Sequence, residues 1–296
     1  MYMKFRTSEL SAVTIGFMLV IGLILGLIVI GRCWCTEKFK SPESSKKLAV
    51  VCCLTRGYKK IEKYEMLIER NKCIEQLAWS SKYDHVIFHE GNISQDQQIH
   101  ISQQTPMLRL TFKDIKQTFE REPQRVPSDQ ECKLHDQFPI GYKRMCRFWF
   151  VDFWSFVKDY QYMVRFDEDI QLSAKTQDPV AYCLQNDLKY ICPTLMREAP
   201  QVIDGLDRMT TLPKEDLLNI PGTHTEIFDI QYYLTNDKAM EFVRKIDESG
   251  CIMKNRWGDA PLTGILVREF TPEHQYKFKW NGFVGKHLSH NSKYGY

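Results

Sequence analysis

The hydrophobic and polar positions divide this chain into regions of different character, beginning with an uncharged apolar stretch over residues 10–31. About 20 apolar residues span the hydrocarbon core of a bilayer, so this stretch predicts a single transmembrane signal anchor. Residues 1–9 would then form a cytosolic tail. Residues 32–47 are polar, with Ser, Pro and several Lys, and predict a short stem. The globular domain is expected over residues 48–296.

The region after the stem switches between strand-like and helix-like patterns. Residues 48–54 form an apolar run of strand length, and residues 61–77 repeat apolar positions at helical spacing. Further strands are expected over residues 84–88 and 107–112. Strands separated by helices predict an α/β fold in which a mostly parallel central sheet is flanked by helices.

The second half of the domain continues this pattern. Residues 142–160 carry an aromatic stripe and predict a core-packed helix, followed by an apolar strand over residues 162–170. Residues 198–221 contain Gly and Pro and are expected to be an irregular surface segment bordering a substrate cleft. Helices are expected over residues 236–247 and 259–270.

Composition excludes one large class of function. The chain has 296 residues, with 40 basic and 37 acidic side chains and a net charge of +3. No basic stripe interleaved with aromatic residues is present, so nucleic acid is not an expected partner.

Two features favour a luminal, oxidising location for the domain. The chain contains ten cysteines, and Asn92-Ile93-Ser94 matches the acceptor sequence for N-glycosylation. The alternative is that Cys52 and Cys53 are ordinary core thiols and that the sequon arises by chance. Basic residues flank the apolar stretch on both sides, so the positive-inside rule gives little information on orientation.

The strongest candidate for chemistry is the end of the strand over residues 162–170. Asp167 and Asp169 are spaced i, i+2, and side chains with this spacing share one face of a strand. Carboxylates are preferred ligands of Mg²⁺-type ions, so the pair predicts a metal site that holds a nucleotide diphosphate. Arg165 would point the same way, either toward the phosphates or into an ion pair with the carboxylates. The alternative for the pair is a solvated acidic turn.

Three stretches of the chain together resemble a known family. They lie at residues 141–148 (GYKRMCRF), 162–170 (YMVRFDEDI) and 255–261 (NRWGDAP). In order and spacing they resemble the fungal Golgi α-1,2-mannosyltransferases of glycosyltransferase family 15. The resemblance implies a type II membrane protein with a GT-A type catalytic domain. It also implies transfer of mannose from GDP-mannose to a glycan acceptor with retention of configuration, using Mn²⁺.

Carried over by position, the resemblance assigns roles to several residues. Tyr142 and Arg147 fall in the family element Tyr-Arg-x-Met-Cys-Arg-Phe and are implied on the nucleotide-sugar side of the cleft. Asp167 and Asp169 fall on the Glu-Pro-Asp element and are implied as metal ligands. The first position is shortened from Glu to Asp, which would change the geometry of the site.

Two further family residues have less direct counterparts. The family element Asn-Phe-Glu-Ile, whose Glu lies near the reacting carbon, is placed on residues 227–230, so that Asp229 stands in for the Glu. A metal-binding His of the family falls near Lys279 or Trp280. His287 is the residue that would serve in its place.

The remaining assignments have simple structural alternatives. Asp259 is implied to contact sugar hydroxyls, but it also lies where a helix N-cap is expected. Trp257 would stack on a sugar face or else pack in the core. Two other functions stay open: a GT-A glycosyltransferase that uses a different nucleotide sugar, and a membrane-anchored glycan-binding protein without catalysis.

Overall fold

The computed structural model describes residues 46–135 and 137–288, and the described residues from Lys47 onward form one compact unit. Within these described ranges no helix is both long and apolar enough to cross a bilayer. The anchor predicted over residues 10–31 and nearly all of the predicted stem lie outside the described residues.

A seven-stranded sheet forms the centre of the domain, in the order β10-β6-β9-β4-β1-β2-β3. Strands β1, β2, β3 and β4 are mutually parallel, while β9 is antiparallel to both of its neighbours. The prediction of an α/β fold with a mostly parallel sheet is therefore confirmed. The bounds are β1 Lys47–Thr55, β2 Asp84–His89, β3 Leu110–Asp114, β4 Tyr160–Phe166, β6 Tyr190–Ile191, β9 Thr225–Asp229 and β10 Tyr276–Lys277.

Two short ribbons flank the main sheet. Strand β5 (Ile170–Leu172) pairs with β11 (Gly285–His287), and β7 (Leu195–Arg197) pairs with β8 (Asn219–Pro221), both antiparallel. The first ribbon brings the C-terminal part of the chain next to the end of β4. The predicted strand over residues 162–170 is thus two strands, β4 and β5, with a turn between them.

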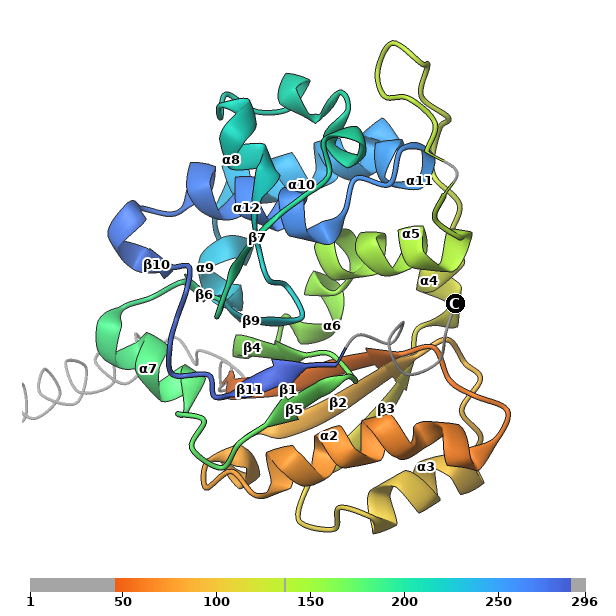
Figure 1. Cartoon of the computed structure of the whole chain (residues 1–296), viewed down its shortest axis with the longest axis vertical. Coiled ribbons are helices and arrows are strands. Elements are labelled where there is room, and N and C mark those ends of the chain that lie inside the picture. The colour runs from red at the N-terminus through yellow and green to blue at the C-terminus, as the bar shows by residue number, and fades with distance from the viewer. Residues whose placement is uncertain (1–45, 136, 289–296) are drawn as a thin grey trace, which may run out of the picture. The chain divides into compact units, whose positions relative to one another are not determined.

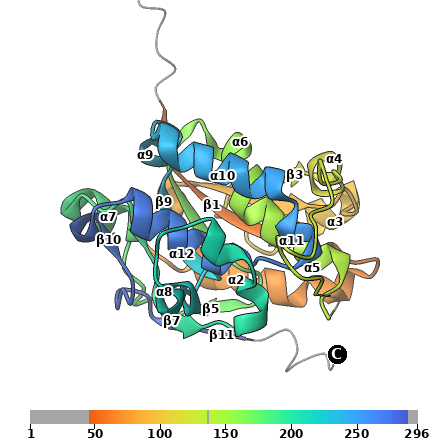
Figure 2. The ribbon, with the colours of Figure 1, turned by 90° about the horizontal axis from the view of Figure 1, so that it is seen from above.

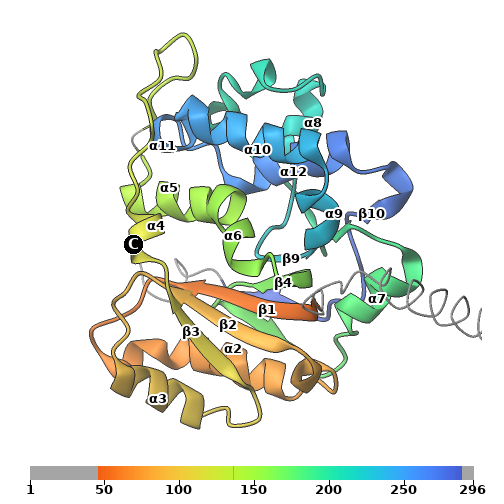
Figure 3. The same cartoon turned by 180° about the vertical axis from the view of Figure 1, so that it is seen from behind.

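Helices cover both faces of the sheet. Helices α2 and α3 lie on one face (Figures 1 and 3), and α5, α6, α10 and α12 lie on the other (Figures 1 and 2). The bounds are α2 Glu65–Glu75, α3 Gln95–Gln103, α4 Lys116–Phe119, α5 Ile140–Arg147, α6 Trp154–Val157, α7 Pro179–Asn186, α8 Lys214–Leu218, α9 Ile230–Leu234, α10 Asp237–Ser249, α11 Cys251–Lys254 and α12 Asp259–Phe270. The 3-10 helices are Ile61–Tyr64, Ser80–Lys82, Pro200–Ile203, Leu206–Arg208 and Glu273–Gln275.

The aromatic helix predicted over residues 142–160 is interrupted. A π-helical turn, Phe148–Asp152, separates α5 from α6. Its rings pack as predicted: Phe148 lies 5.1 Å from Phe88 of β2 between ring centroids, and Phe153 lies 5.9 Å from Phe228 of β9. These contacts attach the helical layer to the sheet, so the alternative of core packing holds for this stripe.

The segment over residues 198–221 is more regular than predicted. It contains two 3-10 helices, α8 and β8, because Val202, Leu206 and Leu217 are buried in the core shared with the helical layer. A disulfide joins Cys132, in the preceding loop, to Cys251 at the start of α11. Cys52 and Cys53 are buried free thiols on β1, as the core-thiol alternative expected.

Candidate functional site

The candidate site lies where β1 and β4 part at their carboxyl ends. The chain leaves β1 toward β2 on one side, whereas β4 lies on the other side, so the order of strands reverses between them. In open α/β sheets, ligands bind in the crevice at such a reversal. Asp167 follows directly after β4, which ends at Phe166, and therefore lies at this crevice.

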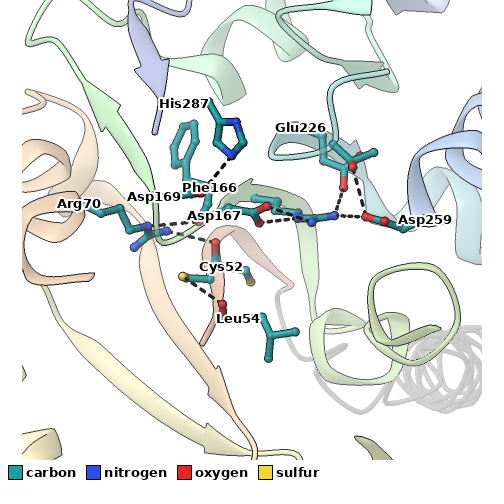
Figure 4. Close-up of polar contacts among 12 residues, drawn as sticks. Cys52, Leu54, Arg70, Phe166, Asp167, Asp169, Glu226, Asp259 and His287 are labelled. Atoms are coloured by element: carbon teal, nitrogen blue, oxygen red, sulfur yellow. Dashed lines mark hydrogen bonds and ion pairs between the residues drawn. The ribbon is translucent and has the colours of Figure 1, made fainter. Parts of the chain in front are cut away.

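Arg165 joins the three carboxylates that Figure 4 labels as Asp167, Glu226 and Asp259. Its guanidinium is buried and donates to these three carboxylates, which come from the turn after β4, from β9 and from α12. The partners are Asp167 at 2.8 and 3.2 Å, Glu226 at 3.1 Å and Asp259 at 2.7 Å. Of the two alternatives for Arg165, the structure contains the ion pair.

Glu226 is the most deeply buried of these carboxylates. Its second oxygen accepts a hydrogen bond of 3.0 Å from the hydroxyl of Tyr190. Burial raises the pKa of Glu226 to about 8, although Arg165 acts in the opposite direction. Asp259 adds to the rise because like charges disfavour ionisation. A carboxylate that titrates near neutral pH inside a crevice is typical of a functional site.

Asp167 and Asp169 turn toward different partners. Asp167 is held by Arg165, whereas Asp169 lies 3.1 Å from Nε2 of His287. The two carboxyl groups are still close enough that Asp169 contributes to the raised pKa of Asp167, although desolvation is the larger cause. The prediction that both side chains lie on one strand face is not what the structure contains, because β4 ends at Phe166 and both follow in a turn.

His287 reaches Asp169 through strand pairing. In the β5–β11 ribbon His287 pairs with Ile170, and the amide of the next residue, Leu288, donates to the carbonyl of Asp169 at 2.8 Å. The ring of His287 also stacks on His224, with centroids 4.5 Å apart. The long-range ribbon thus brings together Asp169 and His287, two residues predicted as metal ligands.

The metal-ligating side chains at this site can hold a hard divalent ion only if water and substrate oxygens complete its coordination shell. In the described part of the chain no three His, Cys, Asp or Glu side chains form a complete metal cage. Asp169 and His287 offer one carboxylate and one imidazole at one point, beside Asp167. Mn²⁺- and Mg²⁺-type ions commonly take one or two protein carboxylates and complete their shell with water and phosphate oxygens. The residues present fit an ion bound in that way.

The structure does not bring Asp229 to this site. In the antiparallel β4–β9 pair, Asp229 is registered with Tyr162, whereas Thr225 is registered with Phe166 at the crevice end. Asp229 caps α9 by accepting from the amide of Tyr232 at 3.1 Å. Glu226 instead lies at the crevice. The signal was present in the sequence, because Glu226 and the following Ile match the Glu-Ile of the family element Asn-Phe-Glu-Ile.

Two residues predicted on the substrate side are also elsewhere. Arg147 is buried, with its Nε 3.3 Å from Asp152, and its other nitrogens donate to backbone carbonyls. Trp257 is 1% exposed and donates to the carbonyl of Asp204 at 2.9 Å. Both contacts belong to the packing of the helical layer, so the core alternative for Trp257 describes its observed position.

Tyr142 and Asp259 lie beside the site. Asp259 is the first residue of α12, but its carboxylate makes no cap and accepts from Arg165 and from the hydroxyl of Thr223 at 3.2 Å. Tyr142 accepts a bond of 2.9 Å from Arg256, and Asp259 contributes to the raised pKa of the Tyr142 hydroxyl, which burial raises most.

The fold of the described domain is that of known sugar-transferring enzymes. It matches core-mannan synthase A (CmsA/Ktr4) of Aspergillus fumigatus in its Mn/GDP form, with a TM-score of 0.68, 16% identity, and coverage of 84% of this chain and 77% of that one. It also matches the mannosyltransferase Ktr4p of S. cerevisiae in complex with GDP, with a TM-score of 0.67, 16% identity, and coverage of 84% and 73%.

A sequence relative points the same way. The chain is 29% identical over an alignment of 151 residues to the probable mannosyltransferase MNT3 of Candida albicans, and the match covers 44% of this chain and 40% of that protein. The match thus spans about two fifths of the length of this relative. No protein-family model matches the chain. The predicted resemblance to fungal mannosyltransferases is confirmed by these similarities.

Proposed function

We propose that this chain is a metal-dependent glycosyltransferase that transfers mannose from GDP-mannose to a mannoside or glycan acceptor. The observation that carries the proposal is the cluster in which Arg165 binds Asp167, Glu226 and Asp259 at the strand crevice, beside the Asp169–His287 pair. The proposal is supported by the fold shared with two mannosyltransferases whose structures contain GDP.

Asp169 and His287 are proposed to hold the divalent cation, with Asp167 beside them. The ion, Mn²⁺ by analogy with the A. fumigatus enzyme, would neutralise the charge of the leaving diphosphate. Arg165 keeps Asp167 at the crevice, and the position of the β11 ribbon fixes His287 against Asp169. These residues therefore orient the donor by its phosphates.

Glu226, rather than Asp229, is proposed to lie at the sugar. Transfer breaks the bond between the anomeric carbon and the diphosphate oxygen and forms one to an acceptor hydroxyl oxygen, whose proton passes to the leaving diphosphate, with positive charge developing on the sugar. The ionised form of a carboxyl group near that carbon stabilises this charge, and a bound divalent cation would favour that form by opposing the rise in its pKa. Arg165 and Tyr190 fix Glu226 from two sides, while Asp259 and Tyr142 border the place where sugar hydroxyls would bind. We propose retention of configuration and an α-1,2 linkage from the family resemblance alone.

The location of the enzyme is also a proposal. A type II protein of the Golgi membrane, with a luminal domain, accords with the uncharged stretch over residues 10–31 and with the Cys132–Cys251 disulfide. Disulfides persist in oxidising compartments and are rare in the cytosol.

The test is a donor assay on the full chain purified in detergent. The protein is incubated with Mn²⁺ and a panel of sugar nucleotides, and released nucleotide is measured with and without α-methyl mannoside. We expect turnover of GDP-mannose that Asp169→Ala abolishes. Asp237→Ala, an exposed carboxylate in the first turn of α10, is the matched control and should keep full activity.

Other results would assign a different function. Turnover of another donor alone would retain the glycosyltransferase and reject mannose as the sugar. No turnover, together with no Mn²⁺-dependent nucleotide binding, would reject both enzymes and favour the glycan-binding protein. Activity that persists in Asp169→Ala would reject the proposed metal site.

A further inference from the structure

Arg70 is a fully buried arginine that lies behind the candidate site rather than in it. It projects from α2, and its side chain is 1% exposed. Arginines are almost never fully buried unless they are paired, because removing the charge from water is costly. Among the described residues no carboxylate forms an ion pair with Arg70, so its bonds need another explanation.

The guanidinium donates to backbone carbonyls of two neighbouring strands (Figure 4). Nε lies 3.2 Å from the carbonyl of Phe166, the last residue of β4. Nη2 lies 3.2 Å from the carbonyl of Cys52 on β1. Nη1 donates to the side-chain oxygen of Asn71 at 2.8 Å, which fixes the orientation of the planar group.

These two carbonyls lie where β1 and β4 separate. The parallel pairing of the strands ends with Cys52 opposite Arg165. Beyond this point β1 stays paired with β2 as far as Thr55, while Phe166 is paired with β9. Arg70 therefore joins one carbonyl on each strand at the fork that opens the crevice.

Electrostatics place Arg70 close to the acidic turn. The Cys53 thiol is buried, and burial is the main cause of its raised pKa. Arg70 lowers this pKa, whereas Asp167, Glu168 and Asp169 raise it. The guanidinium and the acidic turn thus both lie close enough to β1 to act on the same thiol.

We propose that Arg70 is a positioning residue that fixes the β1–β4 fork and thereby the direction in which Asp167 and Asp169 leave β4. The peptide group is planar, so holding the carbonyl of Phe166 also holds the amide that begins Asp167. Catalytic groups must be held within about 0.5 Å of their productive positions, and neighbours that touch no substrate supply that precision. The expected effect on nucleotide binding rests on the proposed function, whereas the hydrogen bonds of Arg70 to the two strands do not.

The test compares two buried arginines. Arg70→Lys keeps the charge but cannot reach both carbonyls with a planar fork, and Arg70→Met removes charge and donors together. Arg147→Lys and Arg147→Met are the matched controls, because Arg147 is equally buried and also bonds backbone carbonyls, but in the helical layer. GDP affinity in Mn²⁺ is measured by calorimetry, and amide hydrogen exchange is followed over residues 166–170.

We expect Arg70→Met to weaken Mn²⁺-dependent GDP binding by about 10- to 100-fold, as is typical when a residue that supports metal ligands is lost. The GDP affinity of Arg70→Lys should lie between that of Arg70→Met and that of the wild type. Exchange over residues 166–170 should accelerate in both Arg70 variants and stay unchanged in both Arg147 variants, whatever their thermal stability.

Equal GDP affinity and equal exchange in the Arg70 and Arg147 variants would overturn the proposal and leave Arg70 a residue of general stability. The exchange comparison does not depend on activity. A wild-type protein that binds no nucleotide would therefore reject the proposed function, while unaltered exchange in the Arg70 variants would reject this inference.

Discussion

Strands β4 and β9 carry acidic residues at both ends of their pairing, and the two ends differ in how those residues are held. At one end Asp229 accepts from the amide of Tyr232, from the side-chain amide of Gln161 and from Lys189 at 3.5 Å. At the other end Asp167 and Glu226 compete, together with Asp259, for the single guanidinium of Arg165.

The difference separates a structural carboxylate from a functional cluster. The amide bonded to Asp229 is three residues away in sequence, so it is a local cap that ends β9 and begins α9. The partners of Arg165 lie up to 94 residues away, and these three carboxyl groups outnumber the one cation. That surplus is costly to the apoprotein, and a divalent ion bound beside it would relieve the repulsion.

The largest effect is expected on stability, from removing the shared cation. Arg165→Met should lower the free energy of unfolding by about 3–5 kcal/mol, because three carboxylates would lose their common partner. Urea denaturation at neutral pH measures this. Arg244→Met, which breaks exposed ion pairs on α10, should change the free energy of unfolding far less, because water and salt screen those charges. A similarly small loss of unfolding free energy in Arg165→Met and Arg244→Met would mean that the carboxyl groups of the cluster do not depend on Arg165.

A smaller effect is expected on activity, from replacing the acidic group at each end of the β4–β9 pair with an amide. Glu226→Gln should reduce kcat by at least about 100-fold, the scale on which loss of one electrostatic group slows an enzyme. Asp229→Asn keeps the shape of the side chain at the other end and should leave kcat and KM for GDP-mannose unchanged. A large loss in Asp229→Asn alone would restore the assignment made from the sequence.

The pH dependence of stability should show that the crevice end of the β4–β9 pair contains an acidic group with a raised pKa. The folded pKa of Glu226 is about 8, above its ordinary value of 4.5, so the folded protein retains a proton that the unfolded chain releases. Its contribution is therefore complete below about pH 4.5 and is lost as the pH rises through about 8. The difference in unfolding free energy between the wild type and Glu226→Gln should shift in favour of the variant from pH 6 to pH 9, measured by urea titration in EDTA. A constant difference would show that Glu226 has an ordinary pKa.

Sequence reasoning located one side of this site and missed the other for physical reasons. The apolar run that leads to Asp167 is a local pattern, so the strand and the parallel sheet could be predicted directly, whereas the turn that follows Phe166 was only the alternative to a longer strand. The residue within 225–229 that faces the crevice is set by the antiparallel register with β4, which neither strand specifies alone. The signal in the sequence was the match of Glu226 and the following Ile to the family element, and the assignment passed over it. The assignment therefore fell on Asp229, three residues past Glu226.

Arg70 shows a second limit of local patterns. It lies among apolar positions on a predicted helix, where an arginine reads as a surface residue. Its role depends on a fork between two strands, one of which is 96 residues away in sequence at Phe166. His287 was found only because the family resemblance called for a histidine, while the ribbon that seats it against Asp169 was not foreseen.

The smallest expected effect tests whether Asp229 is a cap and nothing more. Asp229→Ala should lower the free energy of unfolding by about 1 kcal/mol, as N-cap removal does, with unaltered KM for GDP-mannose. Asp178→Ala is the matched control, since Asp178 caps α7 through the amides of Val180 and Ala181. Equal decreases in stability on thermal denaturation would show that Asp229 and Asp178 both act as helix N-caps. If Asp229→Ala cost far more than Asp178→Ala and also reduced kcat, the two ends of the β4–β9 pair would have to be coupled through β9, and the division between cap and site would fail.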